Sequence, residues 1–204
     1  MEPLTDKADM IWQTLHSASI SYEQSMDALH RKQMGCYFTD LDLAYGMMTE
    51  LVNSFPPSAQ HVLFSKTFLE PCVGAGNFVF AYLRVCKEMM FPTEQYQELL
   101  NHIYACDINR GALEVYRKSL TLLAQEWFGI TLTAEYFDTH VGGGLLFDVD
   151  AADIHYIPVE EVFDSRIVKS GFDIVATNPP YKNLKAERAH YQTDAQKADD
   201  KQKY

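Results

Sequence analysis

Apolar residues recur at helical spacing along the first part of the chain. Within residues 5–33 they fall on one stripe with a 3.6-residue period, which predicts a long amphipathic helix. We expect this helix to end near Gly35, because glycine commonly follows the last turn of a helix. The stripe consists of Ala8, Ile11, Trp12, Leu15, Tyr22, Met26 and Leu29.

A second helix is predicted from Thr39 to a point before Pro56-Pro57. The spacing from Thr39 to Asp42 resembles a capping box, and the double proline cannot continue a helix. The side chains expected to point inward are Ala44, Met47, Met48, Leu51 and Val52.

Beyond residue 66, short apolar runs alternate with helical patterns. The expected strands are residues 67–69, 102–106, 130–137 and 172–176, and the expected helices are 77–90 and 110–126. Alternation of this kind indicates βαβ units and therefore an α/β fold with a doubly wound parallel sheet, here with an N-terminal helical extension. Ligands of such sheets bind at the carboxyl ends of the strands.

Composition places the chain among globular proteins with one core. A length of 204 residues suits one α/β domain, and 47% hydrophobic residues indicate a packed interior. No run of ~18 apolar residues exists, so we expect no membrane span, and the N-terminus lacks the regions of a signal peptide. The use of cysteine makes a reduced cytoplasm the expected compartment. Four cysteines without a CxxC spacing argue against a zinc site or disulfide framework, so we expect no metal.

Charge is unevenly distributed. The net charge of −11 argues against a broad nucleic-acid-binding face. Residues 182–204 differ from the rest, because six Lys or Arg outnumber four Asp or Glu there. We expect residues 184–204 to form a polar helix or a disordered tail.

The first candidate site is a glycine turn between a strand and a helix, containing Glu70, Pro71, Gly74, Gly76 and Phe78. Glycines let the backbone turn tightly and approach a ligand closely. An ordinary tight turn explains the glycines about as well. A dinucleotide loop would have Gly or Ala at the position of Val79, so the acidic residue and proline fit a ligand with an ammonium or sulfonium group better.

Carboxylates after two later segments form the second candidate. Asp107, with Ile108 beside it, follows an apolar strand, where an acid commonly accepts both ribose hydroxyls of a nucleotide. A cap of the following helix is the alternative role for Asp107. Asp153 with Ile154 is placed to bind and cover an adenine ring, although Asp148 and Asp150 compete for that role and a solvated loop acid is as good an explanation.

The third candidate is the sequence Asn178-Pro179-Pro180-Tyr181 at the end of the last apolar run. Two prolines fix consecutive φ angles, so this loop is stiff. The Asn178 side-chain oxygen and the Pro179 carbonyl can both accept from one exocyclic amine, and Tyr181 offers a ring face for a base drawn out of a duplex. An ordinary Asn-Pro turn is the alternative.

In this order the motifs resemble those of the S-adenosylmethionine-dependent DNA adenine-N6 methyltransferases of the gamma arrangement. Residues 35–39 are similar to the family's Gly-x-Tyr-Tyr-Thr-Pro element, with Asp40 in place of proline. The glycine loop matches with Glu70 in place of the commoner Asp, Asp107 matches the ribose acid, and residues 172–181 match the catalytic strand and loop. The match spans roughly residues 35–183.

The resemblance implies a Rossmann-like methyltransferase sheet, S-adenosyl-L-methionine as cofactor and DNA as partner, with a possible place in a restriction-modification system. Asn178, Pro179, Pro180 and Tyr181 would be catalytic. The implied cofactor residues are Tyr37, Thr39, Glu70, Pro71, Gly74, Gly76, Phe78, Asp107, Ile108, Asp153, Ile154 and Asn178. Thr39 would hold the cofactor's carboxylate, with capping of the second helix as its alternative.

The resemblance also divides the chain. Residues 1–57 would be a helical segment with the methionine-binding element, 58–183 an incomplete methyltransferase core and 184–204 the polar tail. Family members continue past the Asn-Pro-Pro-Tyr loop into a recognition domain, so we expect this chain to be the N-terminal catalytic part only. Alternative functions are methylation of protein glutamine or RNA, or cofactor binding without catalysis.

Overall fold

The computed structural model describes residues 6–29, 31, 37–143, 146–150, 153–156, 159–164 and 169–179. In the ranges 146–150 and 153–156 it describes the backbone alone. The chain forms two compact units, one of residues 1–25 with 38–179 and one of residues 26–37 with 180–204. In the second unit, the Arg31 guanidinium lies 5.6 Å from the centre of the Tyr37 ring. The predicted boundaries at residues 57 and 183 stay predictions.

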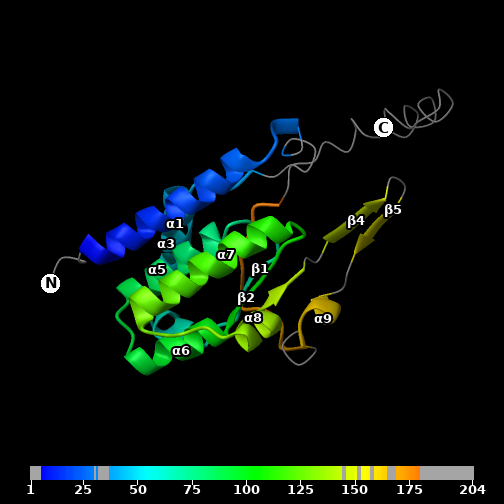
Figure 1. Ribbon diagram of the computed structural model, residues 1–204. Coiled ribbons are helices and arrows are strands. Elements are labelled where there is room, and N and C mark those ends of the chain that lie inside the picture. Colours follow the sequence, from blue (N-terminus) through cyan, green and yellow to red (C-terminus); the bar gives the residue numbers. More distant parts are fainter. Residues whose placement is uncertain are drawn as a thin grey trace. The chain divides into compact units, whose positions relative to one another are not determined.

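The first unit is built on a parallel sheet with the strand order β3-β2-β1-β6 (Figure 1). Its strands are β1 (Phe68–Glu70), β2 (Ile103–Cys106), β3 (Val141–Gly142) and β6 (Ile174–Val175). A separate antiparallel pair consists of β4 (Leu146–Asp150) and β5 (Asp153–Tyr156). The α/β class and the parallel sheet predicted from the sequence are confirmed.

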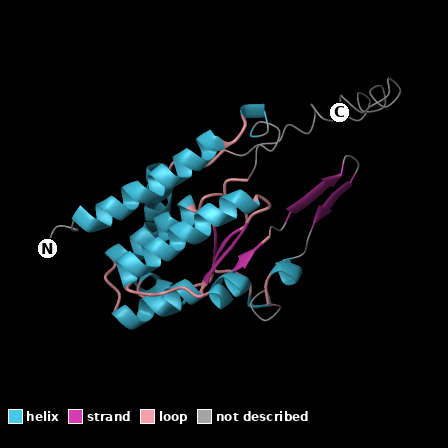
Figure 2. Ribbon diagram, in the orientation of Figure 1, coloured by secondary structure: helices cyan, strands magenta, loops and turns pink. Residues whose placement is uncertain are grey.

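Helices precede the sheet and connect its strands (Figure 2). The N-terminal helices are α1 (Asp6–Ser25), α3 (Leu41–Ser54) and α4 (Pro57–Gln60), followed by the 3-10 turn η1 (Leu63–Ser65). Between β1 and β2 lie α5 (Asn77–Glu88) and α6 (Thr93–Asn101). Between β2 and β3 lie α7 (Arg110–Leu123), the π-helical turn η2 (Ala124–Phe128) and α8 (Ala134–His140), and α9 (Val159–Val162) follows β5. Among the described residues, no helix is both long enough and apolar enough to cross a bilayer.

Alternate residues of β1 and β2 belong to different cores, because successive side chains of a strand point to opposite faces of the sheet. Phe68, Ile103 and Ala105 join the large core formed with α1, α3, α5, α6, α7 and α8. Leu69 and Tyr104 join a smaller cluster with Phe163, against which residues of α9 pack. Both faces of the two central strands, β1 and β2, are therefore covered, as is typical of parallel strands.

The N-terminal helices depart from the prediction in their ends and faces. Helix α1 ends at Ser25, and Leu29, expected on its apolar stripe, is 64% exposed. Gly35, its expected end, lies outside the described residues. The cap of α3 is Asp40, whose carboxylate accepts from the backbone N–H groups of Asp42 and Leu43, so the predicted Thr39 cap is wrong. Met47, expected inward, is exposed.

The predicted strand 130–137 is wrong. Thr133 accepts a hydrogen bond from the backbone N–H of Tyr136 and begins α8, so a local cap overrides the alternating apolar pattern. Tyr136 and Phe137 are both buried, which a half-exposed strand would not allow. The third strand of the sheet is instead β3, Val141–Gly142.

Candidate functional site

The site lies where the strand order changes direction. From β1 the chain moves outward through β2 to β3, then returns to place β6 on the other side of β1. Such a switch point leaves a crevice beyond the carboxyl ends of the two central strands, and ligands of open α/β sheets bind there. Here the strands on either side of that point, β1 and β6, are followed by the loop after Glu70 and the loop after Val175.

The glycine loop after β1 has a conformation that other residues would not adopt easily. Gly74 and Gly76 have φ angles of +52° and +104°. A Cβ atom on Gly76 would lie 2.5 Å from the rings of Phe80 and Tyr116, and one on Gly74 would lie 2.8 Å from the ring of Phe38. The predicted strand, turn and helix are present, and close packing explains both glycines. Pro71 is half-buried in this loop, and Phe78 is buried in the large core.

Asp107 follows β2 and joins that strand to the glycine loop. Its Oδ2 accepts from the backbone N–H of Gly74 at 2.7 Å, and its Oδ1 accepts from the N–H of Asn109 at 2.8 Å. Burial raises the pKa of this carboxyl, and the hydrogen bonds from Asn109 and Gly74 oppose that rise. The cap of α7 is Asn109, not Asp107. Ile108, beside Asp107, is 38% exposed.

Glu70, the last residue of β1, is a buried carboxyl with 2% of its surface exposed. Its Oε2 accepts from the backbone N–H of Val79 at 3.3 Å. Burial raises its pKa well above the usual value, and the nearby charge of Asp107 adds to the rise. The end of the central strands thus holds two carboxyl groups whose charge is costly unless a cation or hydrogen-bond donors approach them.

The segment before α3 reaches the glycine loop through Asn77, the first residue of α5. The side-chain Nδ2 of Asn77 donates to the Thr39 carbonyl oxygen at 2.6 Å. Thr39 is half-buried at this junction, and its role toward a cofactor stays a prediction. Tyr37 is 45% exposed and belongs to the other compact unit.

The Asn-Pro loop leaves the sheet at β6. The backbone N–H of Ala176 still donates to the Leu69 carbonyl oxygen, and half-buried Asn178 and exposed Pro179 follow. Pro180 and Tyr181 lie outside the described residues. Asp153 and Ile154 lie on β5, and Asp148 and Asp150 lie on β4; these two strands pair with each other and not with the four-stranded sheet. The choice among these acids stays a prediction.

Sequence reasoning missed residues that hold the site in place. Asp173, before β6, accepts from the backbone N–H and the hydroxyl of Thr67 and from Lys66, which fixes β6 beside β1. Asn109 precedes a helix, a position where asparagine is a recognised cap signal. For Asp173 no comparable local signal exists, because its partners are about a hundred residues away in the chain.

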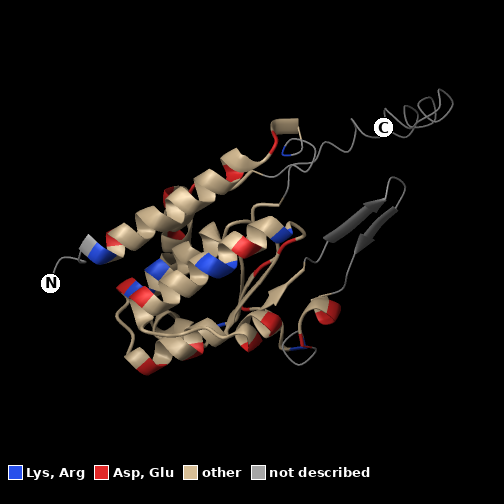
Figure 3. Cartoon of the chain, in the orientation of Figure 1, with Lys and Arg blue, Asp and Glu red and all other residues tan. Residues whose placement is uncertain are grey.

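Charges on the described helices are mixed. Figure 3 shows acidic and basic positions interspersed on these helices, and the net charge of the chain is −11.

A parallel sheet of this order, with a glycine loop after β1, an acid after β2 and an Asn-Pro loop after β6, is a Rossmann-like methyltransferase fold. A family model described as Eco57I restriction-modification methylase matches residues 101–204. The chain belongs to this family, and membership implies DNA as its substrate. The matched range includes Asp107 and the Asn-Pro-Pro-Tyr sequence but not the glycine loop. A search of curated proteins finds no match.

Proposed function

We propose that the protein transfers the methyl group of S-adenosylmethionine to the exocyclic N6 amine of adenine in DNA. The observation that carries the proposal is the adjacency of β1 and β6 in parallel register, with Phe68 paired to Ile174 and Leu69 to Val175. This pairing brings a glycine loop that suits a nucleotide-like cofactor and a stiff amide-bearing loop to one edge of the sheet.

The residues at the end of β1 fit a cationic methyl donor. Glu70 and Asp107 are acceptors with raised pKa values, and a positive ligand would favour their charged forms. Asn77 Oδ1 is buried and has no hydrogen-bond donor among the described residues, so a ligand donor would satisfy it.

The cofactor roles are those that the motif resemblance implies. Asp107 would bind the ribose hydroxyls, exposed Ile108 would lie against the adenine ring and Thr39 would hold the carboxylate. Asp153 with Ile154 would complete the adenine contacts. When bound, S-adenosylmethionine supplies a sulfonium methyl group that is open to attack by a nucleophile.

The chemistry assigned to Asn178 follows from the weakness of adenine's amine as a nucleophile, since its lone pair is delocalised into the ring. Asn178 Oδ1 and the Pro179 carbonyl would accept the two amine hydrogens and favour a localised lone pair. The methylated ammonium is acidic enough to lose its proton to water, so no strong general base is needed. Alignment of the amine with the methyl group supplies most of the acceleration, up to roughly 7–11 kcal/mol at its limit.

The target adenine must leave the duplex to reach this edge of the sheet. Tyr181 would stack on the extruded base, since stacking on an aromatic ring contributes about 1–3 kcal/mol per base.

Substitution Asn178→Ala tests the proposal. We expect loss of methyl transfer by at least a hundredfold, with the dissociation constant of S-adenosylmethionine, measured by calorimetry, changed less than threefold. The matched control is Asn101→Ala, because Asn101 is exposed at the end of α6. Equal loss of binding and transfer in Asn178→Ala would contradict the catalytic role, and failure of the wild-type protein to bind S-adenosylmethionine would overturn the proposal.

A further inference from the structure

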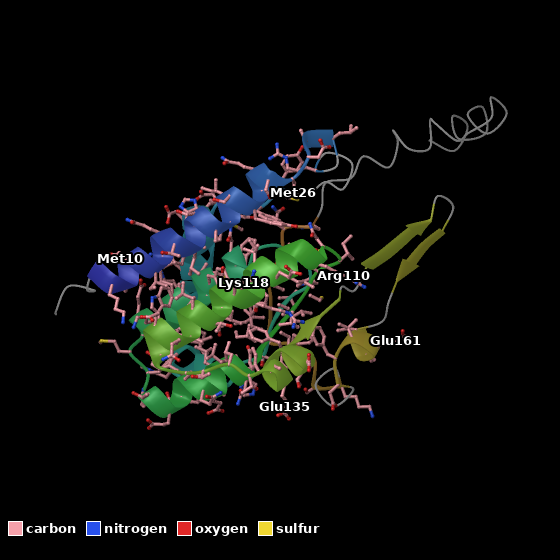
Figure 4. The ribbon with its side chains drawn as sticks, viewed as in Figure 1. Met10, Met26, Arg110, Lys118, Glu135 and Glu161 are labelled. Carbon is pink, nitrogen blue, oxygen red and sulfur yellow. The ribbon has the colours of Figure 1, made fainter. Side chains whose placement is uncertain are left out.

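Helix α1 contacts α7, and the two run side by side (Figure 1). Their side chains meet in the space between them, with Arg110 at the beginning of α7 (Figure 4). Two polar residues of α1, Ser19 and Tyr22, are spaced three apart and therefore lie on one face of the helix. Ser19 is only 3% exposed and Tyr22 is half-buried. Both side chains make hydrogen bonds to residues of the cofactor loops.

Ser19 is bound to the glycine loop through Asn77. The Asn77 Nδ2 donates to Ser19 Oγ at 3.0 Å and to the Thr39 carbonyl oxygen at 2.6 Å. Asn77 directly follows Gly76 and is 6% exposed. One buried amide group therefore joins α1, the segment before α3 and the first turn of α5.

Tyr22 reaches the other two loops. Its hydroxyl donates at 2.8 Å to Oδ1 of Asn109, the residue that caps α7 and whose N–H binds Asp107. Its ring stacks on Phe38 with centres 6.0 Å apart and planes inclined by 10°. The Phe38 ring in turn occupies the space beside Gly74 that a Cβ atom would need.

We propose that α1 is part of the methyl-donor site, with Ser19, Tyr22 and Asn77 as positioning residues that fix three loops relative to one another. The loops are the segment around Thr39, the glycine loop and the turn from Asp107 to Asn109. The assignment to a methyl donor rests on the proposed function. The family match begins at residue 101 and gives α1 no role.

The physical benefit of this arrangement is preorganisation. A ligand that bridges three loops must otherwise order them on binding, and that lost freedom weakens affinity. Here, buried hydrogen bonds from α1, which is anchored in the core, hold the three loops in place before a ligand binds. Ile11, Trp12 and Leu15 provide that anchor, since all three belong to the large core.

Tyr22→Phe removes one hydroxyl and keeps the ring. We expect the dissociation constant of S-adenosylmethionine to rise roughly fivefold, the size expected for one net hydrogen bond. The rate of methyl transfer at saturating cofactor should stay within twofold of wild type. If Tyr22 had a purely structural role, Tyr22→Phe would lower the melting temperature but would not weaken cofactor affinity while leaving the transfer rate unchanged.

The matched control is Tyr45→Phe. The Tyr45 hydroxyl donates to Glu88 Oε2 at 2.7 Å and is also partly buried, but it links α3 to α5 away from the loops. Both variants should lose similar thermal stability, and only Tyr22→Phe should lose cofactor affinity. Equal affinity losses in the two variants, or none in Tyr22→Phe, would overturn the positioning role.

A second readout needs no ligand. The N–H of Gly74 donates to Asp107 and should exchange with deuterium several-fold faster in Tyr22→Phe than in wild type or Tyr45→Phe. Unchanged exchange at Gly74 would contradict the inference even if affinity changed. If the wild-type protein does not bind S-adenosylmethionine, the proposed function fails, and this comparison alone decides whether α1 fixes the loops.

Discussion

At the scale of one residue, the buried carboxyl of Glu70 lowers the stability of the ligand-free protein when it is charged. The carboxyl is 2% exposed and accepts from one backbone N–H, that of Val79, so its charged form is poorly solvated. Its pKa is raised well above the usual value by burial and by the charge of Asp107. Below the usual carboxyl pKa of about 4.3 the group is neutral both folded and unfolded. Stability therefore falls as the pH rises through the interval between that value and the raised one.

We expect Glu70→Gln to stabilise the ligand-free protein at neutral pH and to weaken S-adenosylmethionine binding at least tenfold. Each 1 kcal/mol gained should raise the melting temperature by about 2–4 °C. The gain should vanish near pH 4, where the native carboxyl is already neutral. Thermal melts across pH measure this, with exposed Glu98→Gln as control. A melting temperature that falls at neutral pH would contradict this interpretation of Glu70.

Gly76 provides a second test at the residue scale. Alanine there would have a φ of +104° and a Cβ atom 2.5 Å from the rings of Phe80 and Tyr116. Gly129 also has a positive φ, +70°, but its Cβ would meet nothing within 4 Å. Gly129→Ala should cost about 1–2 kcal/mol for the backbone alone, and Gly76→Ala about 1–3 kcal/mol more for overpacking. Urea denaturation measures both, and equal losses would show that the rings adjust without cost.

At the scale of elements, the start of α3 shows which residue caps this helix. The sequence had offered Thr39 either as that cap or as a residue that binds the cofactor's carboxylate. Asp40 makes the capping hydrogen bonds of α3, and hydrogen bonding from Leu43 holds the pKa of that carboxyl below its usual value. Because Asp40 caps α3, Thr39 does not have the capping role. Where the resembling motif has proline, this chain has Asp40, and its carboxylate caps α3.

Asp40→Ala should lower the free energy of unfolding by about 1 kcal/mol, the usual value of an N-cap. Thr39→Ala should lower it by less than half as much and should instead weaken S-adenosylmethionine binding. Urea denaturation and calorimetry on the two variants give both quantities. The assignment fails if Thr39→Ala costs stability as much as Asp40→Ala and leaves binding unchanged.

The sequence predicts elements best where the signal is local. The strand, glycine turn and helix around Gly74 are present, and β2 was predicted within one residue. A strand was predicted at residues 130–137 from apolar residues at alternate positions. Thr133 caps α8 within this range, so the alternation does not reflect a strand. The strands β4 and β5 pair with an irregular register between Leu146 and Val149. This irregularity obscures the two-residue alternation of side chains from which a strand is predicted.

At the scale of the whole first unit, topology assembles the site. Glu70 ends β1, whereas Asp107 and Asn178 follow β2 and β6. The order β3-β2-β1-β6 brings the ends of these three strands to one edge. Sequence order and apolar runs were enough to predict this convergence, because parallel strands share the direction of their carboxyl ends. The supporting contacts from Ser19, Tyr22 and Asp173 were not predictable, since each joins segments distant in the chain.

The central claim is that this edge of the sheet methylates the N6 amine of adenine in DNA. The most direct test incubates the protein with S-adenosylmethionine carrying a labelled methyl group and duplex DNA of mixed sequence, then identifies the methylated nucleoside by mass spectrometry. We expect N6-methyl-deoxyadenosine from the wild-type protein and from Asn101→Ala, and none from Asn178→Ala. Label on cytosine, or on adenine with Asn178→Ala as active as wild type, would contradict it.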